Sequence, residues 1–169
     1  MLALALVAAL AGADEFRLPP NIVVAASLLP IVEDALRASP TLREQCARIA
    51  RMRRVRVRVD VDASEFPSLA GGARAHTNIR RYQFGLIAAA VHLWSTRDAA
   101  ALLAHELEHV SEYAEGIDYR AEATRDPRSV WATGPNIFET RRAVRAGRVV
   151  ADELAAEQQR VAVAPALPR

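Results

Sequence analysis

A change of hydrophobic period near residue 54 constrains the fold of this chain most strongly. Apolar residues recur at helical spacing over residues 41–52, whereas valines alternate with charged residues over residues 54–62. Alternation with a period of two is typical of a strand that has one buried face and one solvated face. A helix followed directly by such a strand predicts an α+β domain.

The other expected elements follow from the same patterns and from their end signals. Ser39-Pro40 separates two helices, because serine caps a helix and proline suits its first turn. Ser95-Thr96 is expected to cap a third helix, which ends at Gly116. The expected helices are 31–38, 41–52, 95–115 and 137–160, and the expected strands are 54–62 and a hairpin of 74–82 with 86–93, with irregular structure at 16–30, 63–73 and 117–135.

Length, charge and cysteine content limit the class of protein. The chain has 169 residues, which is typical of one domain, and its 51% hydrophobic and 25% charged residues exclude a disordered chain. All 22 basic residues are arginine, and the net charge of +2 is small for a nucleic-acid-binding protein. Cys46 is the single cysteine, which excludes an internal disulfide and a cysteine-based zinc ribbon.

The arginines of the alternating strand invite a nucleic-acid interpretation. No aromatic residues are interleaved with Arg54, Arg56 and Arg58, although a single-strand binder stacks bases on such rings. A solvated strand face is therefore the favoured interpretation, and no nucleic-acid partner is expected.

The amino-terminal residues 1–13 form an apolar run that ends in the small-x-small pattern Ala11-Gly12-Ala13. This pattern predicts a secretory signal peptide and export to the periplasm or the medium. The run is too short to span a bilayer, and the positive region that usually precedes it is missing. The true start then lies further upstream, or the run is a buried amino-terminal helix. A single domain is expected over 14–160, with a flexible tail over 161–169.

The strongest functional motif is His105-Glu106-Leu107-Glu108-His109, an HExxH pattern on the third predicted helix. Residues four apart lie on one helical face, so both imidazoles can reach one Zn²⁺ ion. Glu106 follows the first ligand and is placed to act as a general base on an activated water. The alternative is a solvated helix with two histidines, but the apolar residues of this helix indicate that it is partly buried.

A third ligand is expected to be a carboxylate, because catalytic zinc sites have three protein ligands and no histidine follows His109. Glu139 is the preferred candidate, since it lies 30 residues downstream at the start of the last predicted helix, whose face continues with small apolar residues. Glu122 is the second candidate. A structural alternative remains open, in which Asn136 caps that helix and Glu139 closes a capping box.

Two segments, LAHELEHV at 103–110 and FETRRA at 138–143, make this sequence similar to the gluzincin zinc metallopeptidases. It looks most like small exported bacterial HExxH proteins of unassigned function. The resemblance covers about residues 74–155. It implies a minimal zincin-like domain, in which a small antiparallel or mixed sheet packs on the HExxH helix and a C-terminal helix carries the third ligand.

The resemblance also implies that zinc is bound by His105, His109 and Glu139, with Glu106 as the base. This chain departs from the family at two points. Family members place an aspartate four residues after the third ligand to orient a histidine, where this chain has Ala143, so Asp118 or a backbone carbonyl would have to replace it. The downstream histidine that stabilises the oxyanion is also absent. Candidates for that role are Tyr119, Arg142, Tyr113 and His76.

Two functions remain open from the sequence. The first is a small exported zinc metallopeptidase whose peptide or protein substrate, as the resemblance implies, is held by β-augmentation on one strand of the 74–93 hairpin. The second is a non-catalytic, zinc-stabilised binding or assembly protein. An open coordination position marks the first, and a fourth protein ligand marks the second. The sequence does not indicate an oligomeric state.

Overall fold

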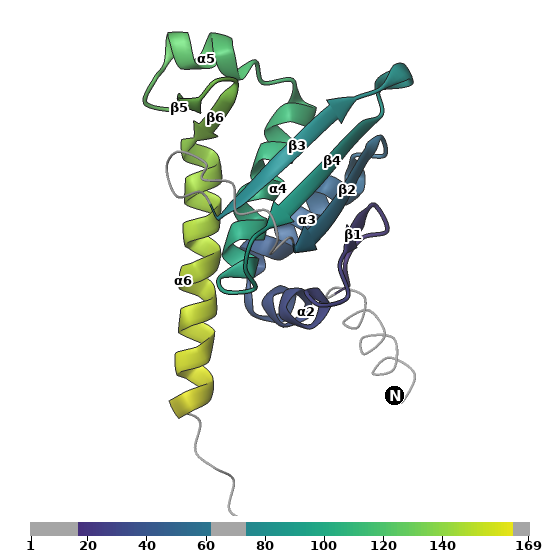
Figure 1. Ribbon diagram of the computed structural model, residues 1–169. Helices are drawn as coiled ribbons and strands as arrows, with labels where there is room; N and C mark the ends of the chain where they lie inside the picture. The colour runs from purple at the N-terminus through teal and green to yellow at the C-terminus, as the bar shows by residue number, and fades with distance from the viewer. Residues whose placement is uncertain (1–16, 62–73, 164–169) are drawn as a thin grey trace, which may run out of the picture.

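The valine alternation forms β2, an inner strand of a four-stranded mixed sheet. In this computed structural model, which describes residues 17–61 and 74–163, the strand order is β1-β2-β4-β3 (Figure 1). β1 and β4 pair with β2 in parallel, whereas β3 pairs with β4 antiparallel and forms one edge of the sheet. The strands are β1 (Ile22–Val24), β2 (Val55–Val61), β3 (Ala75–Arg81) and β4 (Ile87–Leu93).

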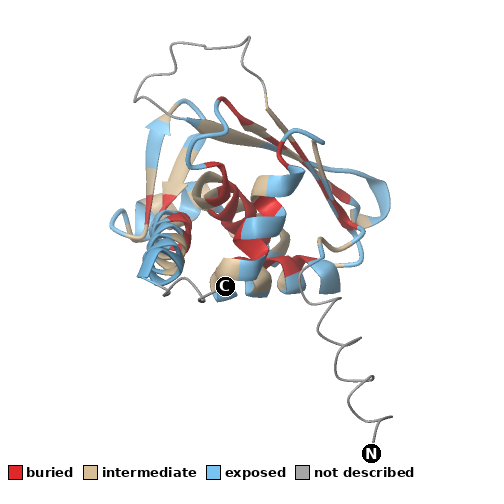
Figure 2. Ribbon diagram, turned by 90° about the horizontal axis from the view of Figure 1, so that it is seen from below, coloured by how far each residue is buried: buried red, intermediate tan, exposed pale blue. Residues whose placement is uncertain are grey.

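One face of this sheet is covered by helices and carries the core. Val55, Val57 and Val59 belong to the core cluster and are at most 2% exposed, whereas Arg56 and Arg58 on the opposite face are exposed. Buried residues gather between the sheet and the helices beneath it (Figure 2). The predicted one-sided strand is therefore confirmed.

The helices begin and end largely where the sequence indicates. Ser39 Oγ accepts a hydrogen bond from the Leu42 N–H at 3.0 Å, and Pro40 occupies the first turn of the helix that follows. Gly116 ends the HExxH helix with a φ of 86°, a left-handed conformation that suits glycine. The helices are α2 (Leu29–Ala38), α3 (Pro40–Arg51), α4 (Ala99–Glu115), α5 (Tyr119–Arg125) and α6 (Arg141–Val163).

α6 packs along α4 and brings the C-terminal part of the chain to the HExxH helix (Figure 1). Ala143, Ala146 and Val150 lie buried on its inner face, as predicted. Gly147 lies on the same face, so close to α4 that a Cβ there would be 2.9 Å from the Ala101 carbonyl oxygen. Because side chains do not tolerate this approach, the absence of a Cβ at Gly147 sets the spacing of the two helices.

The segment between α4 and α6 is more regular than predicted. Residues 117–135, expected to be irregular, contain α5 and β5 (Val130–Gly134). β5 pairs antiparallel with β6 (Ile137–Thr140), so the last helix begins at Arg141 rather than at residue 137. Short elements joined by tight turns concentrate proline and glycine, and for this reason composition alone indicated a loop.

Two more boundaries differ from the prediction. Residues 16–30 were expected to be irregular but contain β1, which is too short to show a periodic pattern. α4 begins at Ala99, and Ser95 does not cap it, because Ser95 Oγ accepts the Arg97 N–H within the preceding turn. Asp98, with a φ of 58°, precedes the helix instead.

Three predicted features fall wholly or partly outside the described residues. They are the signal peptide at 1–13, the whole loop at 63–73 and the end of the tail at 164–169. The first residues of the predicted tail are helical, since α6 extends to Val163. Within the described ranges, no helix has the length and apolar character that a membrane span requires.

Candidate metal centre

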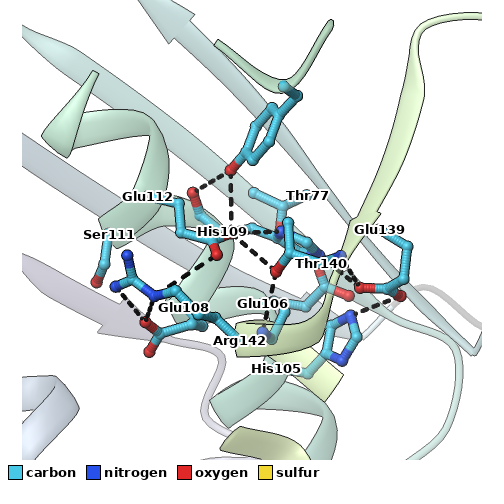
Figure 3. Close-up of polar contacts among 12 residues, drawn as sticks. Thr77, His105, Glu106, Glu108, His109, Ser111, Glu112, Glu139, Thr140 and Arg142 are labelled. Carbon is cyan, nitrogen blue, oxygen red and sulfur yellow. Dashed lines mark hydrogen bonds and ion pairs between the residues drawn. The ribbon is translucent and has the colours of Figure 1, made fainter. Parts of the chain in front are cut away.

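Three side chains converge at the point where β6 meets α6 beside α4. His105 and His109 project from one face of α4, one helical turn apart, and the Glu139 carboxylate faces both imidazoles from β6 (Figure 3). His105 Nε2 lies 3.2 Å from Glu139 Oε2, and His109 Nε2 lies 3.4 Å from Glu139 Oε1. One potential ligand atom from each of the three lies within 4.8 Å of the others.

Each histidine–Glu139 distance is close to the separation of two ligands on one zinc ion, although the two distances end on different carboxylate oxygens. Two ligand atoms at about 2.0–2.1 Å from one ion, at tetrahedral angles, lie about 3.3–3.4 Å apart. Two imidazole nitrogens and a carboxylate oxygen are also a common donor set of catalytic zinc sites. Among the described residues, no fourth His, Cys, Asp or Glu joins this group. The three side chains therefore offer a donor set that could hold zinc.

Glu139 lies on a strand and not on the last helix, which differs from the expected placement. The capping-box alternative is wrong, because Asn136 lies in the turn between β5 and β6 with a φ of 57°. Thr140 caps α6 instead, since its Oγ1 accepts the Ala143 N–H at 3.0 Å. The Glu139 carboxylate is thereby left to face the histidines.

Charge coupling between the three groups is strong. Burial alone would raise the pKa of the Glu139 carboxyl, but hydrogen bonds from His105 and His109 lower it to about 2. Burial alone would lower the pKa of His109, but hydrogen bonds to Glu112 and Glu139 raise it to about 10. In the absence of a cation, hydrogen bonds join these side chains. A bound metal ion would replace the protons of those hydrogen bonds.

Glu106 lies beside this group and is held from the sheet. It is 5% exposed, and the Thr77 hydroxyl of β3 donates to its Oε2 at 2.6 Å. Its charge also contributes to the raised pKa of His109, which indicates that the carboxylate is close to the histidine. Thr77 therefore fixes the orientation of the residue predicted to be the general base.

Glu112 supports His109 from behind, a role that sequence reasoning missed. Its Oε2 lies 3.2 Å from His109 Nδ1, which leaves Nε2 on the side of Glu139. The Thr140 hydroxyl donates to the same oxygen at 3.1 Å. Asp118 or a backbone carbonyl was expected to orient a histidine, and a carboxylate from α4 is placed to do so instead. The available signal was its i+3 spacing from His109.

We use the term supporting layer for four side chains that contact one another behind the candidate ligands, namely Glu108, Glu112, Tyr119 and Arg142. The Tyr119 hydroxyl donates to the His109 carbonyl at 3.0 Å and lies 3.4 Å from Glu112 Oε2, and burial with the nearby Glu112 charge raises its pKa. Arg142 Nη2 donates to Glu108 Oε1 at 2.7 Å, and its Nη1 donates to Glu115 at 2.8 Å. These contacts give both side chains a positioning task, and their catalytic role stays a prediction.

Glu108 forms the base of the supporting layer. It is 6% exposed and accepts hydrogen bonds from Gln45 and Arg48 of α3, as well as from Arg142 of α6. Burial would raise its pKa, but the bonds to Gln45 and Arg142 lower it overall. This buried carboxylate connects α3, α4 and α6 under the histidines.

The remaining candidates lie elsewhere. Glu122, the second choice for third ligand, is on α5, where it pairs with Arg125 at 2.6 Å. Asp118 caps α5 through hydrogen bonds to two backbone N–H groups and does not orient a histidine. His76 stacks on His92 with ring centroids 4.9 Å apart, on the sheet face opposite the core.

No protein-family model, curated protein or solved structure matches this chain.

Proposed function

We propose that this protein is a zinc-dependent hydrolase of peptide bonds with a minimal zincin-like, gluzincin-type site. The observation that carries the proposal is the convergence of His105, His109 and Glu139 at spacings that suit a tetrahedral ion. The absence of a fourth such side chain among the described residues favours a catalytic centre over a closed structural one.

The side chains of this chain divide the work as follows. A bound zinc ion supplies a Lewis acid that polarises a carbonyl and lowers the pKa of water. Glu106, oriented by Thr77, accepts a proton from the attacking water and returns it to the leaving nitrogen. His105, His109 and Glu139 hold the ion, and Glu112 fixes the ring of His109.

The edge strand β3 is the proposed support for the substrate. Among the described strands, β3 pairs only with β4, so its other edge is available to pair with a further strand. Thr77 on the same strand contacts Glu106. An extended peptide that pairs with β3 is therefore guided past the general base.

The deciding experiment compares Glu106→Gln with Glu33→Gln. Glu33 is exposed on α2, so its substitution controls for the loss of one carboxylate. We expect Glu106→Gln to keep one zinc per chain and to lose peptide hydrolysis by about 10²–10⁴-fold, as for removal of a general base. Metal is measured by elemental mass spectrometry and hydrolysis with a mixed quenched-peptide library. Hydrolysis that survives in Glu106→Gln, or its absence in the unchanged protein, contradicts the proposal and favours a zinc-stabilised binding protein.

We also propose export, on the basis of residues 1–13. Mass spectrometry of the protein from its native host should find Asp14 at the amino terminus. A chain that retains Met1 in the cytoplasm contradicts export.

A further inference from the structure

The turn between β3 and β4 presents a surface that the proposed hydrolase does not use. The Tyr82 N–H donates to the Leu86 carbonyl at 2.7 Å and closes the turn, which projects from the end of the sheet (Figure 1). Phe84 at its apex is 88% exposed, and Tyr82 and Leu86 are 51% and 40% exposed. Three large apolar side chains therefore meet solvent at one convex point.

The backbone conformation of this turn does not favour a phenylalanine at position 84. Phe84 has φ 59° and ψ 18°, a left-handed conformation that bulky residues rarely adopt and that asparagine or glycine adopts readily. Gly85 follows with a φ of 74°. An exposed aromatic side chain at a disfavoured backbone position points to a contact outside the chain.

Five exposed arginines lie on the strand ends next to this turn, and one of them, Arg81, lies over the Tyr113 ring of α4. Arg56 and Arg80 are both aligned with Ala88 of β4, so they flank one small residue on the outer sheet face. Arg54 lies over the turn, with Nη1 3.2 Å from the position that a Cβ of Gly85 would take. We define the turn surface as Tyr82, Phe84 and Leu86 with the exposed arginines Arg53, Arg54, Arg56, Arg80 and Arg81.

These arginines are not neutralised by neighbouring acids. Segments 51–59 and 74–97 contain no aspartate or glutamate. Within residues 17–61 and 74–163, none of the five arginines forms an ion pair with a carboxylate. The turn surface is therefore a concentrated positive charge around an apolar apex, although the net charge of the chain is only +2.

We propose that the turn surface docks this protein on anionic phospholipid membranes. Aromatic and aliphatic side chains at a convex apex suit the headgroup region of a bilayer, and arginines bind its phosphate groups. A nucleic acid offers phosphates but no apolar layer to receive Leu86 and Phe84. The apex is also not a flat stacking platform of the kind that single-strand binders use.

The proposal does not depend on the metal centre. Thr77, which contacts Glu106, and Arg81, at the turn, are four residues apart on β3, or about 13 Å at strand spacing. Vesicle binding is therefore measured with and without a chelator, independently of hydrolysis.

The test uses cosedimentation of the full chain with vesicles of phosphatidylcholine alone or with equimolar phosphatidylglycerol. We expect binding to the anionic vesicles only, weakened by salt. Phe84→Asn should reduce the binding constant about tenfold or more, because it removes the buried aromatic ring while suiting the left-handed backbone. Val163→Ser, at another exposed apolar position, should have no effect. All variants keep residues 1–13, so that the apolar run contributes equally.

Two double charge-reversal variants distinguish the effect of the turn arginines from the effect of the net charge. Arg54→Glu with Arg80→Glu should reduce binding by at least about 25-fold, at about fivefold per arginine. Arg145→Glu with Arg148→Glu changes the net charge equally, on exposed positions of α6, and should have a much smaller effect. Equal losses in the two pairs, unchanged binding in folded Phe84→Asn, or tight binding to duplex or single-stranded nucleic acid without vesicle binding would each overturn the proposal.

Discussion

The charged side chains near the two ends of β3 differ in whether they are paired. Around the candidate metal site, which Thr77 contacts through Glu106, arginines pair with carboxylates, as Arg48 and Arg142 do with Glu108. At the turn surface, five exposed arginines have no carboxylate partner among the described residues. At the metal-site end, the charged side chains pair with one another, and these ion pairs fix their positions. At the turn, charge remains available to a partner.

The largest expected effect comes from removing a proposed zinc ligand. Glu139→Ala should weaken zinc binding by more than about 100-fold, beyond the 10–100-fold typical of groups that only support a ligand. Glu122→Ala is the matched control, because this carboxylate pairs with Arg125 on α5. Competition with a chromophoric chelator measures both affinities. Unchanged zinc stoichiometry and affinity in Glu139→Ala, or loss in Glu122→Ala instead, would sink the ligand assignment.

The next effect tests whether the paired charges position the ligands. Glu112→Gln removes the charge beside His109 Nδ1 and should weaken zinc binding about 10–100-fold while the protein stays folded. Glu115→Gln is the control, since Glu115 lies on the same helix but contacts Arg142. If both substitutions change zinc affinity equally, Glu112 has no special role towards His109.

A stability comparison sharpens the contrast between the two ends. Arg142→Met removes a partner of the buried Glu108 carboxylate and should lower the free energy of unfolding by about 1–3 kcal/mol. Arg80→Met, at the turn, should change it by less than about 0.5 kcal/mol. Urea denaturation of the metal-free proteins gives both values. A larger cost for Arg80→Met would mean that the turn arginines are structural.

The last comparison concerns pH, with an expected dependence of about tenfold per unit. His109 in the metal-free protein has a pKa of about 10, so below that pH zinc must displace its proton, and zinc affinity should rise about tenfold per pH unit from 6.5 towards 10. Glu139 has a pKa of about 2 and stays ionised throughout this range. An affinity that is flat over this range, after correction for the chelator, contradicts the coupling.

The same raised pKa has a consequence for the metal-free fold. The folded state holds the His109 proton more tightly than the unfolded state does, so this stabilisation is complete below about pH 6.5. It is lost as the pH rises through about 10. Thermal melting with a chelator present should therefore show a falling midpoint across this interval, and the fall should be absent in His109→Gln.

The sequence predicted the parts of the site that depend on local spacing. His105 and His109 share a helical face because four residues make about one turn, and Glu106 follows from its place in the motif. The one-sided strand β2 and the break at Ser39 were predicted for the same reason. Each of these features depends on neighbours a few residues away.

Most features that depend on distant pairing were not predicted, although the approach of Glu139 to the two histidines was. β1 and β5 are short strands recognisable only beside their partners, and the strand β6 displaced the expected start of the last helix. Glu139 was selected for being on a helix, yet it faces the histidines from a strand. The contacts of Glu112 with Thr140 and of Glu106 with Thr77 cross between elements, so no sequence period reveals them.

Gly147 makes the size of the proposed metal site a property of the backbone. A Cβ at this position would also be 3.3 Å from the Cβ of His105, so the main chain of α6 rests almost directly on the helix that carries the ligands. A larger residue at position 147 would therefore push α4 and α6 apart. Because Glu139 precedes the start of α6 by two residues, such a shift would also move the proposed third ligand relative to the two histidines. The geometry of the proposed site thus depends on the lack of one methyl group at Gly147.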